Sequence, residues 1–236
     1  NLIVVSNEVS GTVTTYKVGD APQPFTLGIF HNNDGESDML GETIEIDGQE
    51  VLAGSVAQFK NSLDSLRQLG VDRGYETIML SSGDNFLAGK EFNASQALDT
   101  YFDAIALDAL DYDAICLGNH DFDFGPDILA ELINAFENNL APYLSSNLNF
   151  SEEPNLQTLV DEGRIAPSTI VERNGEQIGI IGLTTPAITN ISSPGNVQVS
   201  EFIVDSVMNQ VNILTAEGVN KIILISHLQS INEDTA

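Results

Sequence analysis

Short apolar runs with the composition of β-strands alternate with segments of helical periodicity from residue 25 onward. Segment 55–69, for example, places apolar side chains from Val56 to Leu69 at the spacing of one helix face. This alternation predicts a layered α/β domain in which helices cover sheets buried on both faces. The main strands are expected at 25–31, 76–82, 112–117, 142–146 and 220–226, and the helices at 55–69, 92–110, 126–138 and 199–216.

Two dipeptides predict β-hairpins inside this domain. Asp47-Gly48 lies within 43–52, and Asn174-Gly175 lies between apolar runs at 169–173 and 177–183. Both dipeptides favour the positive φ angles of tight two-residue turns. We therefore expect each pair of runs to form antiparallel strands.

The first twenty residues differ from the rest of the chain. Two β-rich runs, at 2–6 and 11–18, predict a further hairpin, and Pro22 and Pro24 mark 21–24 as a linker. An isolated hairpin is only marginally stable in water. We expect residues 1–20 to be the tail of an upstream β domain, similar to the last blade of an extracellular β-propeller, and 25–236 to be a separate domain within a longer polypeptide.

The charge of the chain limits its partners. Thirty-five acidic residues against eight basic ones give a net charge of −27, which opposes binding to a nucleic acid duplex or to anionic lipid. No apolar run approaches the roughly 18 residues needed to span a bilayer. An anionic substrate would need a local positive charge, for which a bound metal is the obvious source. The acid excess also suits a salty medium, so we expect an extracellular or periplasmic location.

Polar loops follow the expected strands. All three histidines, His31, His120 and His227, lie at or just after a strand end, and the loops between them carry acidic and amide side chains. Oxygen ligands mixed with imidazole suit Mn, Fe, Zn or Mg. Strand alternation turns His31 away from its neighbouring loop, so a structural hydrogen bond is at least as good an interpretation for it as catalysis.

Four segments carry a resemblance to a known family. They are Asn-Asp-Gly-Glu at 33–36, Gly-Asp-Asn-Phe at 83–86, Gly-Asn-His-Asp-Phe-Asp at 118–123 and the strand-end histidine at 227. Their order and spacing resemble the calcineurin-like metallophosphoesterases. The 5′-nucleotidase branch is the more similar, because of Phe-Thr-Leu-Gly-Ile-Phe-His-Asn-Asn-Asp at 25–34, the Leu-Ser-Ser-Asn-Leu segment around Asn147 and Gly-Leu-Thr-Thr-Pro at 182–186. The resemblance covers about residues 25–236 and implies an αββα sandwich, incomplete at its C-terminal end.

The resemblance also implies a role for each matching residue. Two divalent ions are expected, with Asp34 as a ligand of the first, Asp84 bridging both, and Asn119 and His227 as ligands of the second. His120 resembles the family's catalytic histidine, oriented by Asp123, and Asn119 and His120 are expected to contact the substrate.

One position departs from the family pattern. The first loop of the family usually has Asp-x-His, whereas this chain has Asp34-Gly35-Glu36. Glu36 as a ligand would favour Mg, Mn or Ca over Zn or Fe at the first site. The alternative is a degraded site in which Glu36 binds no metal.

The leading functional hypothesis is a two-metal hydrolase that releases phosphate from nucleotides or similar phosphomonoesters. One alternative is a non-catalytic extracellular module whose metal stabilises a binding or adhesion domain, as Glu36 and the leading hairpin would fit. The other is a phosphodiesterase on the same fold. The sequence indicates no oligomeric state.

Overall fold

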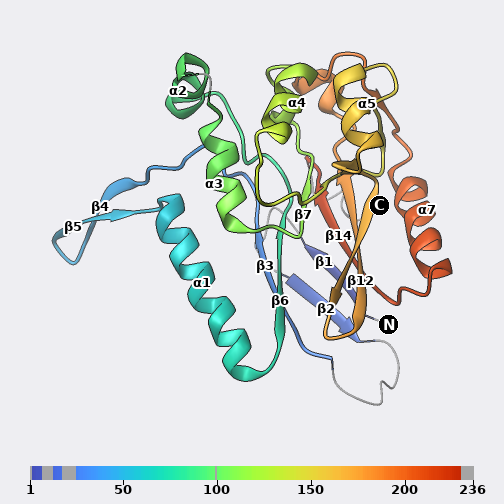
Figure 1. Ribbon diagram of the computed structural model, residues 1–236, viewed down its shortest axis with the longest axis horizontal. Helices are drawn as coiled ribbons and strands as arrows, with labels where there is room; N and C mark the ends of the chain where they lie inside the picture. The colour runs from blue at the N-terminus through green and yellow to red at the C-terminus, as the bar shows by residue number, and fades with distance from the viewer. Residues whose placement is uncertain (1, 7–12, 18–24, 99, 230–236) are drawn as a thin grey trace.

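The computed structural model describes residues 2–6, 13–17, 25–98 and 100–229, with only the backbone of the first two segments. Two five-stranded sheets form its centre (Figure 1). The first sheet is parallel throughout, in the order β10-β8-β7-β6-β3. Its strands are β3 (Leu27–Asn32), β6 (Glu76–Ser81), β7 (Ala114–Cys116), β8 (Tyr143–Leu144) and β10 (Ile165–Ala166).

The second sheet is mixed, in the order β11-β12-β14-β1-β2. Its strands are β1 (Leu2–Ser6), β2 (Val13–Lys17), β11 (Ser168–Arg173), β12 (Glu176–Thr184) and β14 (Lys221–His227). Strand β14 is parallel to both of its neighbours, while the β11–β12 and β1–β2 pairs are antiparallel. The expected first hairpin is therefore confirmed, and it lies beside β14. Its assignment to an upstream domain stays a prediction.

The two sheets pack face to face around aliphatic side chains that alternate along each strand. Ile78 and Leu80 of β6 contact the core between the sheets, while Met79 points to the helices on the other side. In β14, Ile223 and Ile225 join the same core, and Leu224 packs on the opposite face. Such alternation is what a pleated strand buried on both faces requires.

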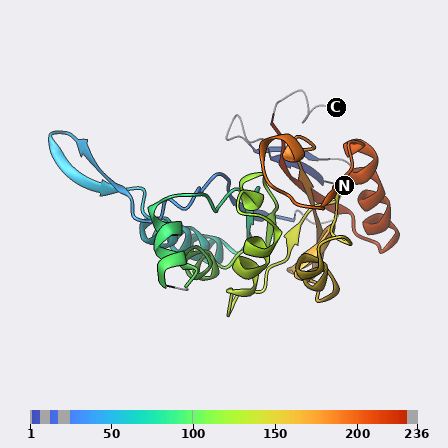
Figure 2. The same cartoon turned by 90° about the horizontal axis from the view of Figure 1, so that it is seen from above.

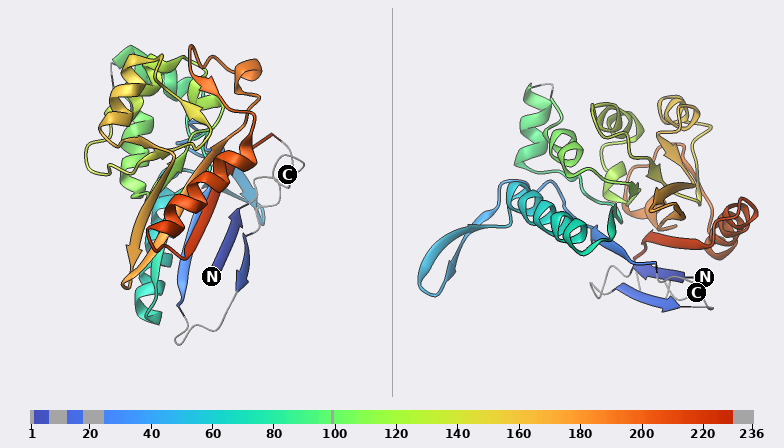
Figure 3. Two further views of the ribbon diagram at one scale, coloured as in Figure 1. Left: turned by 90° about the vertical axis from the view of Figure 1, so that its right-hand side faces the viewer. Right: turned by 60° about the horizontal axis from the view of Figure 1, so that its bottom comes forward.

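Helices cover the outer face of each sheet (Figures 1 and 3). The helices α1 (Val56–Arg73), α2 (Lys90–Leu98), α3 (Phe102–Leu110), α4 (Pro126–Asn134) and α5 (Pro154–Asp161) contribute apolar side chains to the core on the outer side of the first sheet. Helix α7 (Ile203–Ala216) packs Leu214 against the second sheet. The order helix, sheet, sheet, helix confirms the expected αββα sandwich.

Smaller elements complete the chain. They are the β4–β5 hairpin (Glu42–Ile46 and Gln49–Ala53), the single-turn helix η1 (His120–Phe122), the short helix α6 (Ile188–Ile191) and the paired β9 (Leu148–Asn149) and β13 (Gln198–Val199). The β4–β5 hairpin projects from the body of the domain (Figure 2) and confirms the turn predicted at Asp47-Gly48. None of the helices in these described residues has the length and apolar character needed to cross a bilayer.

The structure corrects several predicted boundaries. The helix expected at 92–110 is two helices, because the Ser95 carbonyl accepts from Thr100 N and its hydroxyl accepts from Phe102 N at 3.1 Å, which ends α2 and starts α3 in a new direction. The helix expected from residue 199 begins at Ile203, since residues 198–199 pair with β9 instead. Helix α5 was not predicted from the sequence.

Candidate metal centre

Three of the polar loops meet because the strands before them are parallel neighbours. Strand β6 lies between β3 and β7, so all three strands end at the same edge of the first sheet. Backbone hydrogen bonds then join the first two loops, from Asp34 N to Gly83 O at 3.0 Å and from Glu36 N to Asp84 O at 2.9 Å. The carboxyl edge of a parallel sheet is where such folds bind ligands.

The approach of the second and third loops depends on Gly118. A Cβ atom at this position would lie 2.0 Å from Oδ1 of Asp84. The same oxygen accepts a hydrogen bond from the backbone N–H of His120 at 2.8 Å. The glycine therefore allows the backbone of the third loop to approach the Asp84 carboxylate and to donate a hydrogen bond to it.

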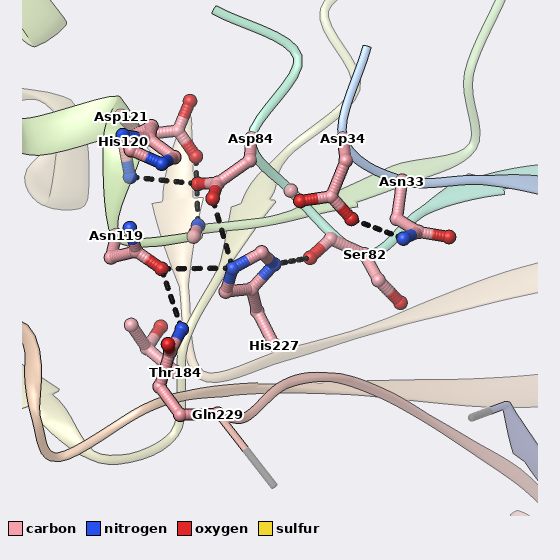
Figure 4. A network of polar contacts seen from close by, with 12 residues as sticks. Asn33, Asp34, Ser82, Asp84, Asn119, His120, Asp121, Thr184, His227 and Gln229 are labelled. Atoms are coloured by element: carbon pink, nitrogen blue, oxygen red, sulfur yellow. Dashed lines mark hydrogen bonds and ion pairs between the residues drawn. The ribbon is translucent and has the colours of Figure 1, made fainter. Parts of the chain in front are cut away.

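Asp34, Asp84 and His227 form one cluster (Figure 4). Each offers a ligand atom, and these atoms all lie within 4.8 Å of one another. Asp84 and His227 are buried, while Asp34 is exposed and is held by a hydrogen bond from the Asn33 side chain. Side chains predicted from three separate parts of the sequence are thus brought together.

The hydrogen bonding of His227 determines which ring nitrogen faces the cluster. Nδ1 lies 2.9 Å from the carbonyl oxygen of Ser82, which accepts only, so Nδ1 carries a proton. In a neutral ring Nε2 then presents a lone pair to Oδ2 of Asp84 at 2.9 Å and to Oδ1 of Asn119 at 3.0 Å. Three lone pairs converge on one point, and only a proton or a cation can occupy it favourably. A histidine that donates one nitrogen to a backbone carbonyl and turns the other to a metal is the usual arrangement in metal sites.

Gln229 is a member of the site that the sequence analysis missed. Its Nε2 donates to Oδ1 of Asn119 at 2.9 Å (Figure 4), which fixes that oxygen, rather than the amide nitrogen, toward His227. Gln229 follows His227 by two residues, just beyond the end of β14, and this proximity in sequence was the available signal.

His120 lies beside this cluster and is held by two further residues. Nδ1 of His120 is 2.6 Å from Oδ2 of Asp123, as expected, and Oδ1 of Asp123 accepts from the Ser192 hydroxyl at 2.8 Å. Partial burial by itself lowers the pKa of His120, but the hydrogen bond to Asp123 and the charges of Asp84, Asp123 and Glu36 outweigh it and raise the pKa. Ser192 gave no signal in the sequence, since it comes from the remote loop after α6.

Two other predicted residues lie outside the cluster. Glu36 is exposed and is not among the three clustered ligands, although its charge acts on His120. His31 places Nε2 at 2.8 Å from the Ser82 hydroxyl, and burial lowers its pKa. His31 thus supports the loop between β6 and Asp84 through a hydrogen bond.

The segments around Asn147 and Thr184 are connected to the third loop by hydrogen bonds. The Asn147 side chain donates to Thr184 O at 2.8 Å and accepts from Thr184 N at 3.0 Å. The Thr184 hydroxyl in turn donates to Leu117 O at 2.7 Å, directly before the third loop. These bonds connect the ends of strands from both sheets.

The buried acids of the site need positive charge. Asp121, 3% exposed, accepts from Gly118 N at 2.7 Å, and burial together with the Asp84 charge raises its pKa. Within the described residues, no lysine or arginine forms an ion pair with Asp34, Asp84 or Asp121. Carboxylate, amide and imidazole ligands of this kind fit a divalent cation.

The fold and this site define a metallophosphoesterase domain, and comparisons with known proteins agree. The chain matches no family model. It is 31% identical to a 5′-nucleotidase of Diplobatis ommata over 94% of its own length, and 30% identical to an apyrase of Tabanus yao over 90%. The crystal structure of a 5′-nucleotidase precursor from Thermus thermophilus superposes with a TM-score of 0.73 at 34% identity, over 86% of the chain.

The chain is therefore similar in sequence to 5′-nucleotidases and an apyrase, and its fold is that of the calcineurin-like metallophosphoesterases. It spans 36% to 38% of the length of the three proteins named above.

Proposed function

We propose that the chain carries the metal centre of a hydrolase that releases phosphate from nucleotides. The observation that carries the proposal is the convergence of Asp84 Oδ2, Asn119 Oδ1 and His227 Nε2 on one point, since Nδ1 of His227 is committed to a backbone carbonyl. The 5′-nucleotidase and apyrase relatives support the nucleotide as substrate.

The centre would hold two divalent ions. Asp34 and Asp84 would hold the first, and Asp84, Asn119 and His227 would hold the second. The predominance of oxygen ligands favours Mn or Mg, and Glu36 stays a candidate ligand of the first ion, to be tested by Glu36→Gln. Such ions supply positive charge for the phosphoryl group and lower the pKa of the attacking water.

The side chains of the chain itself supply proton transfer and positioning. In the imidazolium form of His120 the Nδ1 proton points to Asp123, so the Nε2 proton is the one available to the leaving oxygen. Asp123 stabilises the charged ring, and Ser192 holds Asp123 in place. With Oδ1 of Asn119 fixed by Gln229, its amide nitrogen is the group available to donate a hydrogen bond to the phosphate.

The setting of the domain is also a proposal. The net charge of −27 supports an extracellular or periplasmic location, where salt screens self-repulsion. The greater length of the relatives supports residues 25–236 as part of a larger catalytic region. The linker at 21–24 and the upstream β domain stay predictions from the sequence.

The test measures phosphate release from AMP, ATP and p-nitrophenyl phosphate, and conversion of cyclic AMP to AMP, by the whole polypeptide that contains this chain, loaded with Mn or Mg. The proposal is supported if the rate of phosphate release from AMP falls by about a hundred- to ten-thousandfold in His120→Ala. Cleavage of cyclic AMP alone would identify a phosphodiesterase. Tight metal binding without hydrolysis of any of these substrates would overturn the proposal that the protein is an enzyme, and would favour the non-catalytic binding module.

A further inference from the structure

A cavity lies beside the metal loops, between helices α1 and α3. Its volume is about 450 Å³, within the range of roughly 300–1,000 Å³ that small-molecule sites occupy. The loop after β3 forms one wall, through Asn33 and Ser37, and α3 forms another, through Asp103 and Leu107. None of the clustered metal ligands lines it, so this cavity is distinct from the metal centre.

Asp103 is the unusual member of this lining. The residue is 1% exposed, and within the described part of the chain neither carboxylate oxygen has a hydrogen-bond partner. Leaving a buried carboxylate without a partner costs several kcal/mol. Proteins therefore nearly always provide a donor or a cation for such a group.

The neighbouring polar groups are committed elsewhere. Asn32 donates to Asn85 Oδ1 at 2.8 Å, and the Tyr112 hydroxyl donates to Asn32 Oδ1 at 2.9 Å. Burial raises the pKa of Asp103, and the nearby Ser37 hydroxyl lowers it by a smaller amount. This hydroxyl donates to Leu87 O at 3.0 Å. The donors of Asn32, Ser37 and Tyr112 are thus used in bonds to other side chains and to the backbone.

The charge and the shape of the cavity indicate what it would accept. Among its described lining residues there is no lysine, arginine or histidine, while Asp38 adds a second carboxylate. Met39, Val56, Phe59 and Leu110 give it an apolar side. An anion would be repelled, and a bare metal ion would leave the apolar side and most of the volume unused.

We propose that this cavity is a binding site for a small organic cation, a protonated amine attached to an apolar group. The ammonium supplies the donors that Asp103 lacks, and the apolar group packs against the α1 side. The site goes beyond the proposed hydrolase and does not depend on it.

Benzylammonium is a suitable probe, with benzyl alcohol as its neutral counterpart, and binding is measured by calorimetry on the metal-loaded whole polypeptide. We expect saturable benzylammonium binding that weakens about tenfold or more in Asp103→Asn, because a hydrogen bond to a charged group is lost. Benzyl alcohol should bind the unaltered protein at least about tenfold more weakly than benzylammonium.

Two further variants test separately whether binding depends on the overall charge of the protein and on the free volume of the cavity. Glu50→Gln removes one negative charge from the exposed β4–β5 hairpin and should leave binding unchanged. Ala106→Met fills part of the cavity without altering its charge and should abolish binding. Equal binding to Asp103→Asn, no saturation by benzylammonium, or displacement of the amine by an equal concentration of K⁺ would each overturn the proposal.

Discussion

Nε2 of His227 lies 2.9 Å from Oδ2 of Asp84, although Asp84 follows β6 of one sheet and His227 ends β14 of the other. Because Nδ1 of His227 is bound to the Ser82 carbonyl, a neutral ring has no proton to place between them. This contact is therefore the structural basis for expecting a cation at the site.

Replacing His227 by alanine should weaken Mn²⁺ binding by at least about tenfold, since one ligand is lost and the backbone carbonyl of Ser82 loses its donor. Calorimetric titration with Mn²⁺ provides the measurement. His31→Gln is the matched control, because glutamine can keep a hydrogen bond to the Ser82 hydroxyl and His31 lies outside the cluster. Equal losses in the two variants would contradict the assignment.

Gln229→Met should also reduce Mn²⁺ affinity, by about three- to tenfold, because Asn119 is then free to turn its amide nitrogen toward the site. Affinity can be followed by the EPR signal of free Mn²⁺. Gln157→Met, on the exposed face of α5, is the control and should bind as the unaltered protein does. An unchanged affinity in Gln229→Met would show that Asn119 keeps its orientation without this bond.

Asp123→Asn should lower kcat by about a hundredfold or more, since the His120 ring loses the charge that stabilises its protonated form. Ser192→Ala removes one neutral hydrogen bond to Asp123, so a loss of about three- to tenfold is expected. Both variants should bind Mn²⁺ normally. A fall in metal affinity parallel to kcat would instead point to a general disturbance of the loop.

Gly118→Ala should impair the metal centre, because the added Cβ would lie 2.0 Å from Asp84 Oδ1 and must displace that carboxylate or the loop. The expected result is a lower melting temperature together with weaker Mn²⁺ binding. For Gly89→Ala, where the nearest atom is 3.6 Å from the new Cβ, neither quantity should change appreciably. Normal metal binding by Gly118→Ala would contradict the geometry of the second and third loops.

Asp103 should make stability depend on pH. Burial raises the pKa of Asp103 above its ordinary value of 3.8, so the folded state favours the protonated acid. The protonated Asp103 therefore stabilises the folded state at pH values below the pKa of Asp103 in the unfolded chain. This stabilisation is lost as the pH rises through the pKa of Asp103 in the folded protein. In amine-free buffer, Asp103→Asn should gain about 1–3 kcal/mol relative to the unaltered protein as the pH rises from about 4.5 to 8.

Urea unfolding at several pH values measures this difference. Glu50→Gln serves again as the control, since Glu50 is exposed and should contribute no comparable slope. A difference between Asp103→Asn and the unaltered protein that stays constant with pH would contradict the prediction.

The sequence by itself determined the long strands, the layered architecture and the loops that carry Asp34, Asp84, Asn119, His120 and His227, because these follow from side-chain periodicity and local turn residues. The short strands β9, β10 and β13 were not expected. The role of Asp123 was expected only from the family resemblance of the segment 118–123, and the hydrogen bond to His120 agrees with it. The division of the helix expected at 92–110 was not predictable, because it depends on hydrogen bonds made by Ser95 and not on the apolar pattern.

Only the tertiary structure decided which nitrogen of His227 faces the site, that Gln229 and Ser192 support it, and that Asp103 is buried beside a cavity without a partner. Each of these depends on the distance and direction between atoms from segments far apart in the chain. The periodicity of apolar residues predicts which face of a helix or strand is buried. Which residues contact that face depends on how one sheet packs against the other.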